Sequence, residues 1–223
     1  MVIKSVVDAN KALRSENLVI QTWGNASVRI GNKMYVKPSG VPFEDLDEDK
    51  ISRIDLPSGL HVGGKRPSVD APTHRAIYLN FDRINAIIHT HSKYCTIFAQ
   101  AKQSIPCLGT THADYFYGDI PVIEDLCGEE IDNDYEENTG LKIVEHFRDN
   151  GICPLDMRAA LLPSHGVFVW DTDIESALEN AIVLEYIAEL AYKTLALAGD
   201  HISDKLLDKH FLRKHGNKKY YGQ

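Results

Sequence analysis

Apolar positions along the first third of the chain alternate between helical spacing and short strand-like runs. Over residues 3–13 they recur at the spacing of one helix face, and residues 18–21 follow as a first extended stretch. Strand-like runs then come at residues 26–30, 34–36 and 52–56, separated by turn sequences rich in Gly, Asn, Pro and Ser. This order predicts an opening helix followed by a meander of antiparallel strands.

The remainder of the chain continues the mixture of helices and strands. Asp70 followed by Pro72 has the form of an N-cap with proline in the first turn, which predicts a helix to about Leu79. The further expected elements are a buried strand over 86–91, a helix from Ser92 through Gln100, a helix over 141–149, two short strands within 161–170, and a long helix after a capping box at 172–175. Strands mixed with helices throughout predict an α/β sandwich with a largely antiparallel central sheet.

The chain contains no internal repeat, low-complexity tract or linker, so we expect one domain over residues 1–223. Its formal net charge of -8 argues against a general nucleic-acid or anionic-membrane binder, because those partners require an excess of Lys and Arg. The first twenty residues lack the unbroken apolar core of a secretory signal. Four cysteines, none in a CxxC pair, fit a reducing cytoplasm and buried apolar roles.

The sharpest local motif is His89-Thr90-His91 at the end of an apolar strand. Residues two apart in a strand point to the same face, so both imidazoles aim at one point and form a chelating pair. His165, in a tight Ser-His-Gly turn after another strand, adds a possible third nitrogen. Two histidines at a strand end also occur as ordinary surface residues, and Asp70 is by default a helix cap rather than a fourth ligand. Such a set suits Zn²⁺ or a similar ion such as Mn²⁺.

Three polar segments have the composition of an anion-binding site. They are Gly24-Asn25, Lys37-Pro38-Ser39-Gly40 and Pro67-Ser68. Glycine lets the backbone approach a ligand, while Ser hydroxyls, main-chain N–H groups and Lys bind phosphate oxygens. Each segment taken alone also fits an ordinary surface turn.

Several motifs taken together resemble a known family, and they occur in the order TWGNAS, VKPSG, PSVDAPTH, IIHTHSKYCTIFAQ, IPCLGTTHADYFYG, SHGVFVW, NAIVLE and LLDKHFLRKHGNKKYYGQ. From about residue 6 to the C-terminus they resemble the class II aldolase family. The segment GTTHADYFYG and the ending KHGNKKYYGQ are similar to its L-ribulose-5-phosphate 4-epimerase branch in particular. The HxH motif and the distant histidine are shared with the aldolase branches.

The resemblance implies a three-layer αβα sandwich assembled as a cyclic homotetramer, with active sites shared between subunits and completed by the tail at 203–223. It implies a divalent metal, usually zinc, held by Asp70, His89, His91 and His165. It implies Asp114 and Tyr221 as the acid/base pair, supplied by the neighbouring subunit. The match and the anion-binding segments together give the residues expected to bind substrate or support the chemistry. They are Gly24, Asn25, Lys37, Ser39, Gly40, Ser68, Val69, Thr110, His210 and Arg213.

The activity that the resemblance implies is conversion of L-ribulose 5-phosphate to D-xylulose 5-phosphate, as in L-arabinose or L-ascorbate degradation. Two alternatives remain: a class II aldolase acting on a related ketose phosphate, and a non-enzymatic binding module on the same fold. One position departs from the family pattern, because Val69 stands where a second phosphate-binding serine is expected. The main-chain N–H of Val69 remains available to a phosphate, but the serine hydroxyl is missing. We therefore expect weaker phosphate binding or a shifted substrate.

Overall fold

The computed structural model describes residues 2–217, 219 and 220. Its centre is a seven-stranded sheet in the order β4-β3-β2-β1-β5-β7-β6, and every neighbouring pair in it is antiparallel. The described strands are β1 (Asn25–Ile30), β2 (Lys33–Val36), β3 (Ser52–Asp55), β4 (His61–Gly63), β5 (Ala86–Thr90), β6 (Ala159–Leu161) and β7 (Val167–Asp171). The antiparallel sheet expected from the pattern is confirmed.

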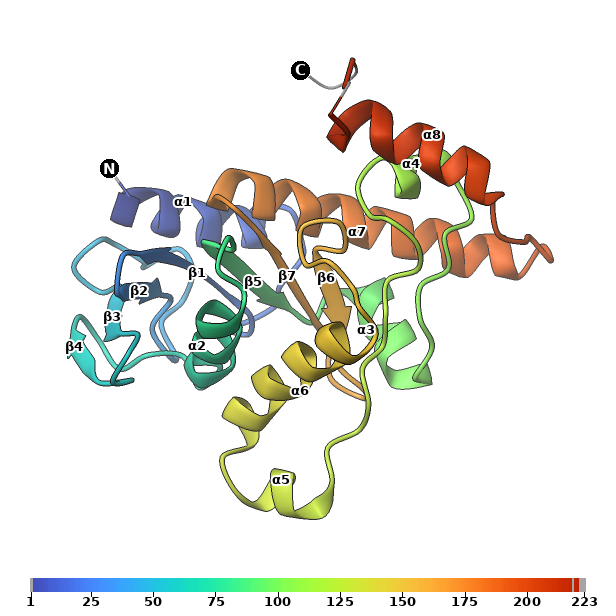
Figure 1. Ribbon diagram of the computed structural model, residues 1–223. Coiled ribbons are helices and arrows are strands. Elements are labelled where there is room, and N and C mark those ends of the chain that lie inside the picture. Colours follow the sequence, from blue (N-terminus) through green and yellow to red (C-terminus); the bar gives the residue numbers. More distant parts are fainter. Residues whose placement is uncertain (1, 218, 221–223) are drawn as a thin grey trace.

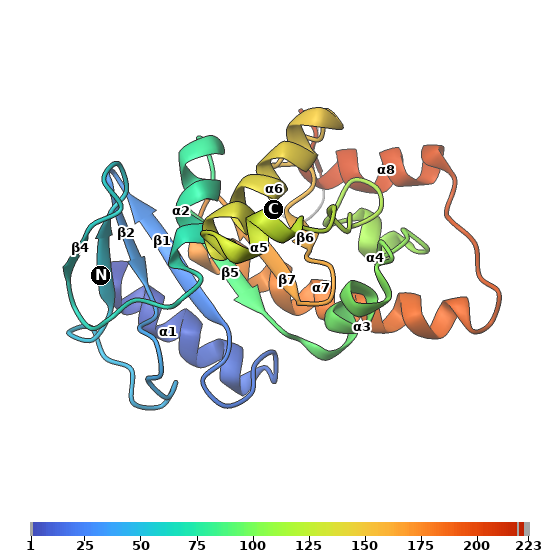
Figure 2. The ribbon, with the colours of Figure 1, turned by 90° about the horizontal axis from the view of Figure 1, so that it is seen from below.

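Helices cover both faces of this sheet (Figure 1). The described helices are α1 (Val2–Ser15), α2 (Ala71–Asn80), α3 (Lys93–Ala101), α4 (Thr110–Ala113), α5 (Gly128–Asp132), α6 (Tyr135–Asp149), α7 (Ile174–Leu195) and α8 (Asp204–His215). α1 and α7 lie together on one face, and α2 and α6 lie on the other (Figures 1 and 2). The three-layer α/β sandwich is therefore confirmed, and α8 packs against α4 at one end of it.

Each face of the sheet is closed by large apolar side chains. On the α2–α6 face, Phe147 of α6 and Phe81, just after α2, both contact the fully buried indole of Trp170 in β7. On the other face, Asn10 of α1 accepts from the main-chain N–H of Ala26 in β1 and so satisfies a buried backbone donor. All five residues of β5 are buried, which explains why the strand opens with three consecutive apolar residues, Ala86 to Ile88.

Gly140 allows α2 and α6 to approach closely. A Cβ built on it would lie 2.6 Å from the main-chain oxygen of Thr73 and 2.7 Å from the Cβ of Ala76, closer than real Cβ atoms come. Glycine inside a helix costs roughly 0.5–1 kcal/mol relative to alanine, so its presence here is explained by the contact. The consequence is that the first turns of α2 and α6 lie side by side.

Several local expectations were wrong in instructive ways. Residues 18–21 belong to an irregular connection rather than a strand, and β4 was not anticipated. Asp173, not Thr172, caps α7, because its carboxylate accepts from the main-chain N–H of Ser176. The start of α3 is likewise not capped by Ser92; the carboxylate of Glu185 on α7 accepts from its first main-chain N–H groups. In α7 the local cap is shifted by one residue, whereas in α3 a remote side chain replaces the local cap that the sequence suggested.

Two of the four cysteines depart from the expected burial. Cys95 and Cys107 are buried, whereas Cys127 and Cys153 are exposed, so the buried apolar role holds for only the first two. All four are free thiols. None of the described helices has the length and apolar character needed to cross a membrane.

Gly140→Ala tests the close packing of α2 against α6. The added methyl group meets main-chain atoms that cannot move independently, so we expect the variant to lose about 1–3 kcal/mol of stability despite the better helix propensity of alanine. Chemical denaturation of both proteins measures the difference. Gly128→Ala is the control, because nothing lies within 4 Å of a Cβ there. Equal stability of Gly140→Ala and the parent would contradict the contact.

Candidate active site

Three histidines converge where β5 ends beside the turn between β6 and β7. His89 is the fourth residue of β5, His91 follows the strand, and His165 lies in the turn. Antiparallel pairing of Thr90 with Val167 brings that turn alongside the end of β5. One ring nitrogen of each histidine lies within 4.8 Å of the others, and in the described part of the chain this is the one His/Cys/Asp/Glu group so arranged. The sequence-predicted triad is thus brought together.

The backbone of the turn is shaped for this approach. A Cβ at Gly166 would lie 2.6 Å from the main-chain oxygen of Thr90 and 3.1 Å from the imidazole of His91, so only glycine fits. Ser164 adopts a left-handed conformation with φ 60°, which turns the chain sharply before His165. The short Ser-His-Gly sequence therefore has a steric reason.

Contacts of the ring carbons and of Nδ1 orient the imidazoles. The ring of His89 stacks on Phe168 at 4.3 Å between centroids, and its Nδ1 lies 3.0 Å from the main-chain oxygen of Val167. With the proton on Nδ1, Nε2 is free to ligate, and it lies 3.0 Å from Nε2 of His91. Nδ1 of His165 lies 3.3 Å from the hydroxyl of Tyr135. These contacts point ligand nitrogens toward a common centre.

Asp70 faces the same pocket and does not act as a helix cap. Its side chain makes no capping hydrogen bond, which corrects the default interpretation of this residue. Its carboxylate oxygen Oδ2 instead accepts from Nδ2 of Asn25 at 2.7 Å and from Oγ of Ser68 at 3.2 Å. Asn25 pairs with His89 across β1 and β5, so the two side chains leave the sheet on one face.

Burial sets the charge of the cluster. It lowers the pKa of His89 to about 3, and it lowers the pKa of His91 and His165 as well. Burial alone would raise the pKa of Asp70, but His89, His74 and the Asn25 hydrogen bond outweigh it and lower that pKa. Near neutral pH the site therefore presents neutral imidazoles and one carboxylate.

The donor set fits a divalent cation. Two nitrogens each about 2.05 Å from a tetrahedral zinc ion are about 3.3 Å apart, close to the 3.0 Å between the Nε2 atoms of His89 and His91. Neutral imidazoles with a carboxylate are ligands that zinc and manganese accept. The residues present are thus compatible with the metal that the family resemblance implies.

The predicted anion-binding segments gather around the histidines. A cavity of about 300 Å³ is lined by the three histidines and by Gly24, Asn25, Lys37, Ser39, Gly40, Ser68, Val69 and Asp70. Lys37 is 2% exposed, its Nζ donates to the main-chain oxygen of Thr22 at 3.1 Å, and burial lowers its pKa to about 8. The same cavity is lined by four residues that the sequence analysis did not single out, namely Thr22, Trp23, Tyr135 and Glu136. Helix α6 begins six residues before the expected residue 141, which is why Tyr135 and Glu136 were missed.

A second polar cluster lies around Asp114, at the end of α4. Its carboxylate accepts from the guanidinium of Arg213 at 3.0 Å and lies 3.1 Å from Nδ1 of His210, while Nε2 of His215 lies 2.8 Å from its main-chain oxygen. Helix α8 thus holds both the carboxylate and the backbone of Asp114. The expected pair of supporting residues is joined by His215, which was not singled out.

The Asp114 cluster does not line the cavity of the three histidines within one chain. It lies between α4 and α8 at one end of the sandwich (Figure 2). Thr110, also expected near the chemistry, is the first residue of α4 and likewise does not line that cavity. Tyr221, the other expected acid/base residue, lies outside the described residues.

Comparison with known proteins identifies the family. Residues 4–192 match the model of the class II aldolase and adducin N-terminal domain. The chain belongs to this family. It is 42% identical, over 99% of its length and 97% of the relative, to L-ribulose-5-phosphate 4-epimerase UlaF of Salmonella paratyphi C (strain RKS4594). The corresponding protein of Salmonella paratyphi B is 41% identical over the same shares of both chains.

Solved structures of the family share the fold. An L-fuculose 1-phosphate aldolase superimposes with a TM-score of 0.79 at 25% identity, over 94% of this chain and 93% of its own. The l-fuculose-1-phosphate aldolase of Thermus thermophilus gives 0.67 at 22% identity, over 87% and 93%. Divalent-metal dependence is typical of the class II aldolase family, and the triad of this chain is able to hold such an ion.

His91→Ala tests the metal assignment. Removing one ligand should weaken metal affinity by at least about 100-fold, because even outer-shell partners contribute about 10- to 100-fold. Elemental analysis after dialysis against limiting zinc measures the occupancy. His201→Ala is the control, since His201 is exposed and pairs with Asp119 instead. Full metal occupancy in His91→Ala would remove His91 from the ligand set.

Proposed function

We propose that this protein is a metal-dependent L-ribulose-5-phosphate 4-epimerase that interconverts L-ribulose 5-phosphate and D-xylulose 5-phosphate. The observation that carries the proposal is the single cavity in which the three histidines and Asp70 lie beside the anion-binding segments. Near full-length identity of 42% to a protein with this activity supports the same substrate. A ketose with a metal-binding end and a phosphate end has the matching chemistry.

The reaction requires more than enolisation. In L-ribulose 5-phosphate the C4 stereocentre is not adjacent to the C2 carbonyl, so its hydrogen is not acidic. Cleavage of the C3–C4 bond in a retro-aldol step gives an enediolate and glycolaldehyde phosphate. The aldehyde turns its other face, the bond re-forms, and the configuration at C4 is inverted. Atoms and electrons balance without a redox partner.

Asp70, His89, His91 and His165 are the residues proposed to hold the metal, with zinc as the first candidate and manganese as the second. When bound, a divalent cation would supply Lewis acidity that offsets the negative charge developing on the ketose. The protein's own contribution is to keep the imidazoles neutral by burial and to aim Asp70 through Asn25 and Ser68.

The phosphate end of the cavity is assigned to Ser39, Gly40 and Ser68. Gly40 has φ 69° and no side chain to block its N–H, Ser39 supplies a hydroxyl donor, and Ser68 would have to turn its hydroxyl from Asp70 to the phosphate. Lys37 lies deeper, against the ring of Phe43, and brings positive charge to the same wall. Holding the phosphate while the aldehyde rotates keeps the fragment in the site.

Inversion presents the C4 oxygen to opposite sides of the site before and after rotation, so one proton-transfer group is needed for each face. Asp114 and Tyr221 are assigned these roles, with Thr110, His210 and Arg213 in support. Because Asp114 does not line the metal cavity of its own chain, we assign it to the site of a neighbouring subunit in a cyclic tetramer. The tail at 203–223 would then complete the active site across that interface.

Asp114→Asn and Tyr221→Phe test the acid/base assignment. Each should reduce kcat for D-xylulose 5-phosphate formation by roughly 10²- to 10⁴-fold while metal content stays normal. A coupled assay with L-ribulose 5-phosphate gives the rate, and Asp200→Asn, whose carboxyl is 98% exposed, is the control.

Co-assembly of inactive His91→Ala and Asp114→Asn chains should restore about a quarter of the parent activity if sites lie between subunits. Absence of rescue would contradict shared sites, and loss of metal in Asp114→Asn would contradict the proposed roles.

Val69→Ser tests the departure from the family pattern. Val69 is 56% exposed and lines the cavity, so a serine there can reach a phosphate oxygen. A hydrogen bond to a charged group contributes about 1.5–3 kcal/mol, so we expect KM to fall by roughly tenfold to hundredfold. Val62→Ser on β4, also exposed, is the control. Unchanged KM and kcat would show that this hydroxyl is not needed.

A class II aldolase that releases its products is the second candidate, supported by the TM-score of 0.79 to an L-fuculose 1-phosphate aldolase. Trapping of free aldehyde in stoichiometric amount during turnover would favour it over the epimerase. Purification of a metal-free protein that cannot be reloaded would instead favour a binding module on the same fold.

A further inference from the structure

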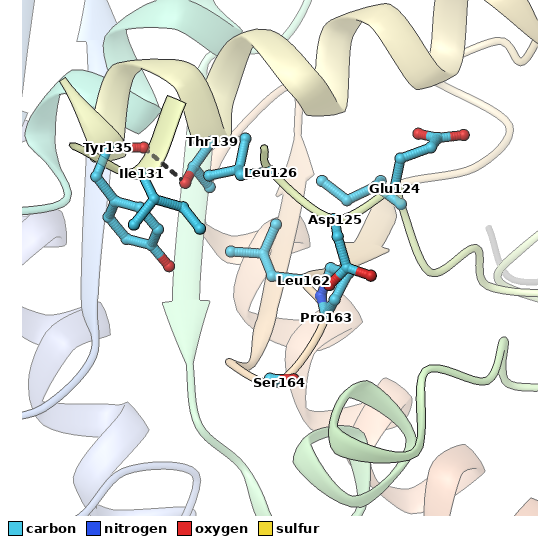
Figure 3. Close-up of a pocket in the computed structure, with 10 residues that line it drawn as sticks. Glu124, Asp125, Leu126, Ile131, Tyr135, Thr139, Leu162, Pro163 and Ser164 are labelled. Carbon is cyan, nitrogen blue, oxygen red and sulfur yellow. Dashed lines mark hydrogen bonds between the residues drawn. The ribbon is translucent and has the colours of Figure 1, made fainter. Parts of the chain in front are cut away.

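Tyr135 separates the metal cavity from a second pocket. It lines the 300 Å³ cavity of the histidines and also a more apolar pocket of about 260 Å³. Figure 3 shows its ring below the start of α6 and beside Ile131, while Leu162 and Pro163, from the segment before His165, line another part of the pocket. The proposed reaction assigns this side chain no role so far.

The hydroxyl of Tyr135 lies against one of the three histidines. It is 3.3 Å from Nδ1 of His165, and the two rings are nearly parallel, at 23° with 6.4 Å between centroids. His89 has the equivalent contact, with the main-chain oxygen of Val167 at its Nδ1. Two of the three imidazoles thus have an oxygen at Nδ1 and leave Nε2 for a ligand.

The fold places Tyr135 with the same helix pair that places Asp70. Tyr135 is the first residue of α6 and follows Asp134, whose φ of 50° turns the chain into the helix. Thr73, three residues after Asp70, donates its hydroxyl to the main-chain oxygen of Glu136. This contact and the close approach at Gly140 tie the first turn of α6 to the first turn of α2.

We infer that Tyr135 is a positioning residue for His165, which holds this imidazole in the tautomer and orientation that present Nε2 to the metal. Ligation through Nε2 requires a proton on Nδ1. The phenol oxygen accepts a hydrogen bond from this N–H and so favours that tautomer. The hydrogen of the phenol is then left to donate into the cavity. The inference rests on the metal site of the proposed function and adds an outer-shell residue to it.

Tyr135→Phe removes the hydroxyl and keeps the ring. We expect its zinc affinity, measured by competition with a chromophoric chelator, to be about 10- to 100-fold weaker than that of the parent. The metal-free variant and the metal-free parent should unfold at nearly the same temperature, because only one long, partly buried hydrogen bond is lost. Tyr186→Phe on α7 is the matched control, since Tyr186 is 55% exposed and does not line the cavity.

Replacement of zinc by Co²⁺ gives a readout that a purely structural role would not change. The d–d absorption of Co²⁺-loaded Tyr135→Phe should differ from that of the parent, because the orientation of His165 alters the ligand field. Parent-like zinc affinity with a parent-like spectrum would overturn the role of Tyr135, as would a large fall in the unfolding temperature of the metal-free variant. Failure of the parent protein to bind zinc would overturn the metal site of the proposed function itself, so the two failures are distinguishable.

Discussion

The close approach of the β6–β7 turn to the end of β5 is the constraint on which the site depends. The register of β5 against β7 sets which residues meet, and Gly166 removes the side chain that would hold the turn away from Thr90. His89, His91 and His165 then share one centre although 74 residues separate His91 from His165 in the sequence. Burial keeps them neutral, and this is the state in which imidazole is a ligand.

The opposite wall of the cavity depends on a second close approach, between α2 and α6. Gly140 lets the two helices touch, and this brings Asp70, just before α2, and Tyr135, the first residue of α6, to the histidines. Asp70 stays ionised in spite of its burial, because the hydrogen bond from Asn25 favours its charged form. Both walls therefore rely on a glycine at a backbone contact, and they bring together polar groups such as Asp70 and Asn25 that hydrogen-bond to each other.

The C-terminal half of α8 holds Asp114, the carboxylate proposed for proton transfer. Arg213, His210 and His215 hold Asp114 at both its carboxylate and its main chain, so its position is strongly determined even though it lies outside the metal cavity of the same chain. This division fits the proposal that a site is completed by two subunits. A metal wall from one chain and a rigid acid/base from the next would let the aldehyde fragment turn between two fixed surfaces.

How much was predictable follows from the range of the interactions. Residue alternation in β5 was sufficient to place His89 and His91 on one face, and the apolar pattern was sufficient for most helices and strands, because both depend on neighbours a few residues apart. Tertiary contacts alone decided the remaining features. Asp70 does not cap α2, Glu185 caps α3 from a distance, and Tyr135 and His215 contact His165 and Asp114. Those contacts join residues far apart in the chain. The spacing of residues in the sequence does not show which distant donors and acceptors the folded backbone brings together.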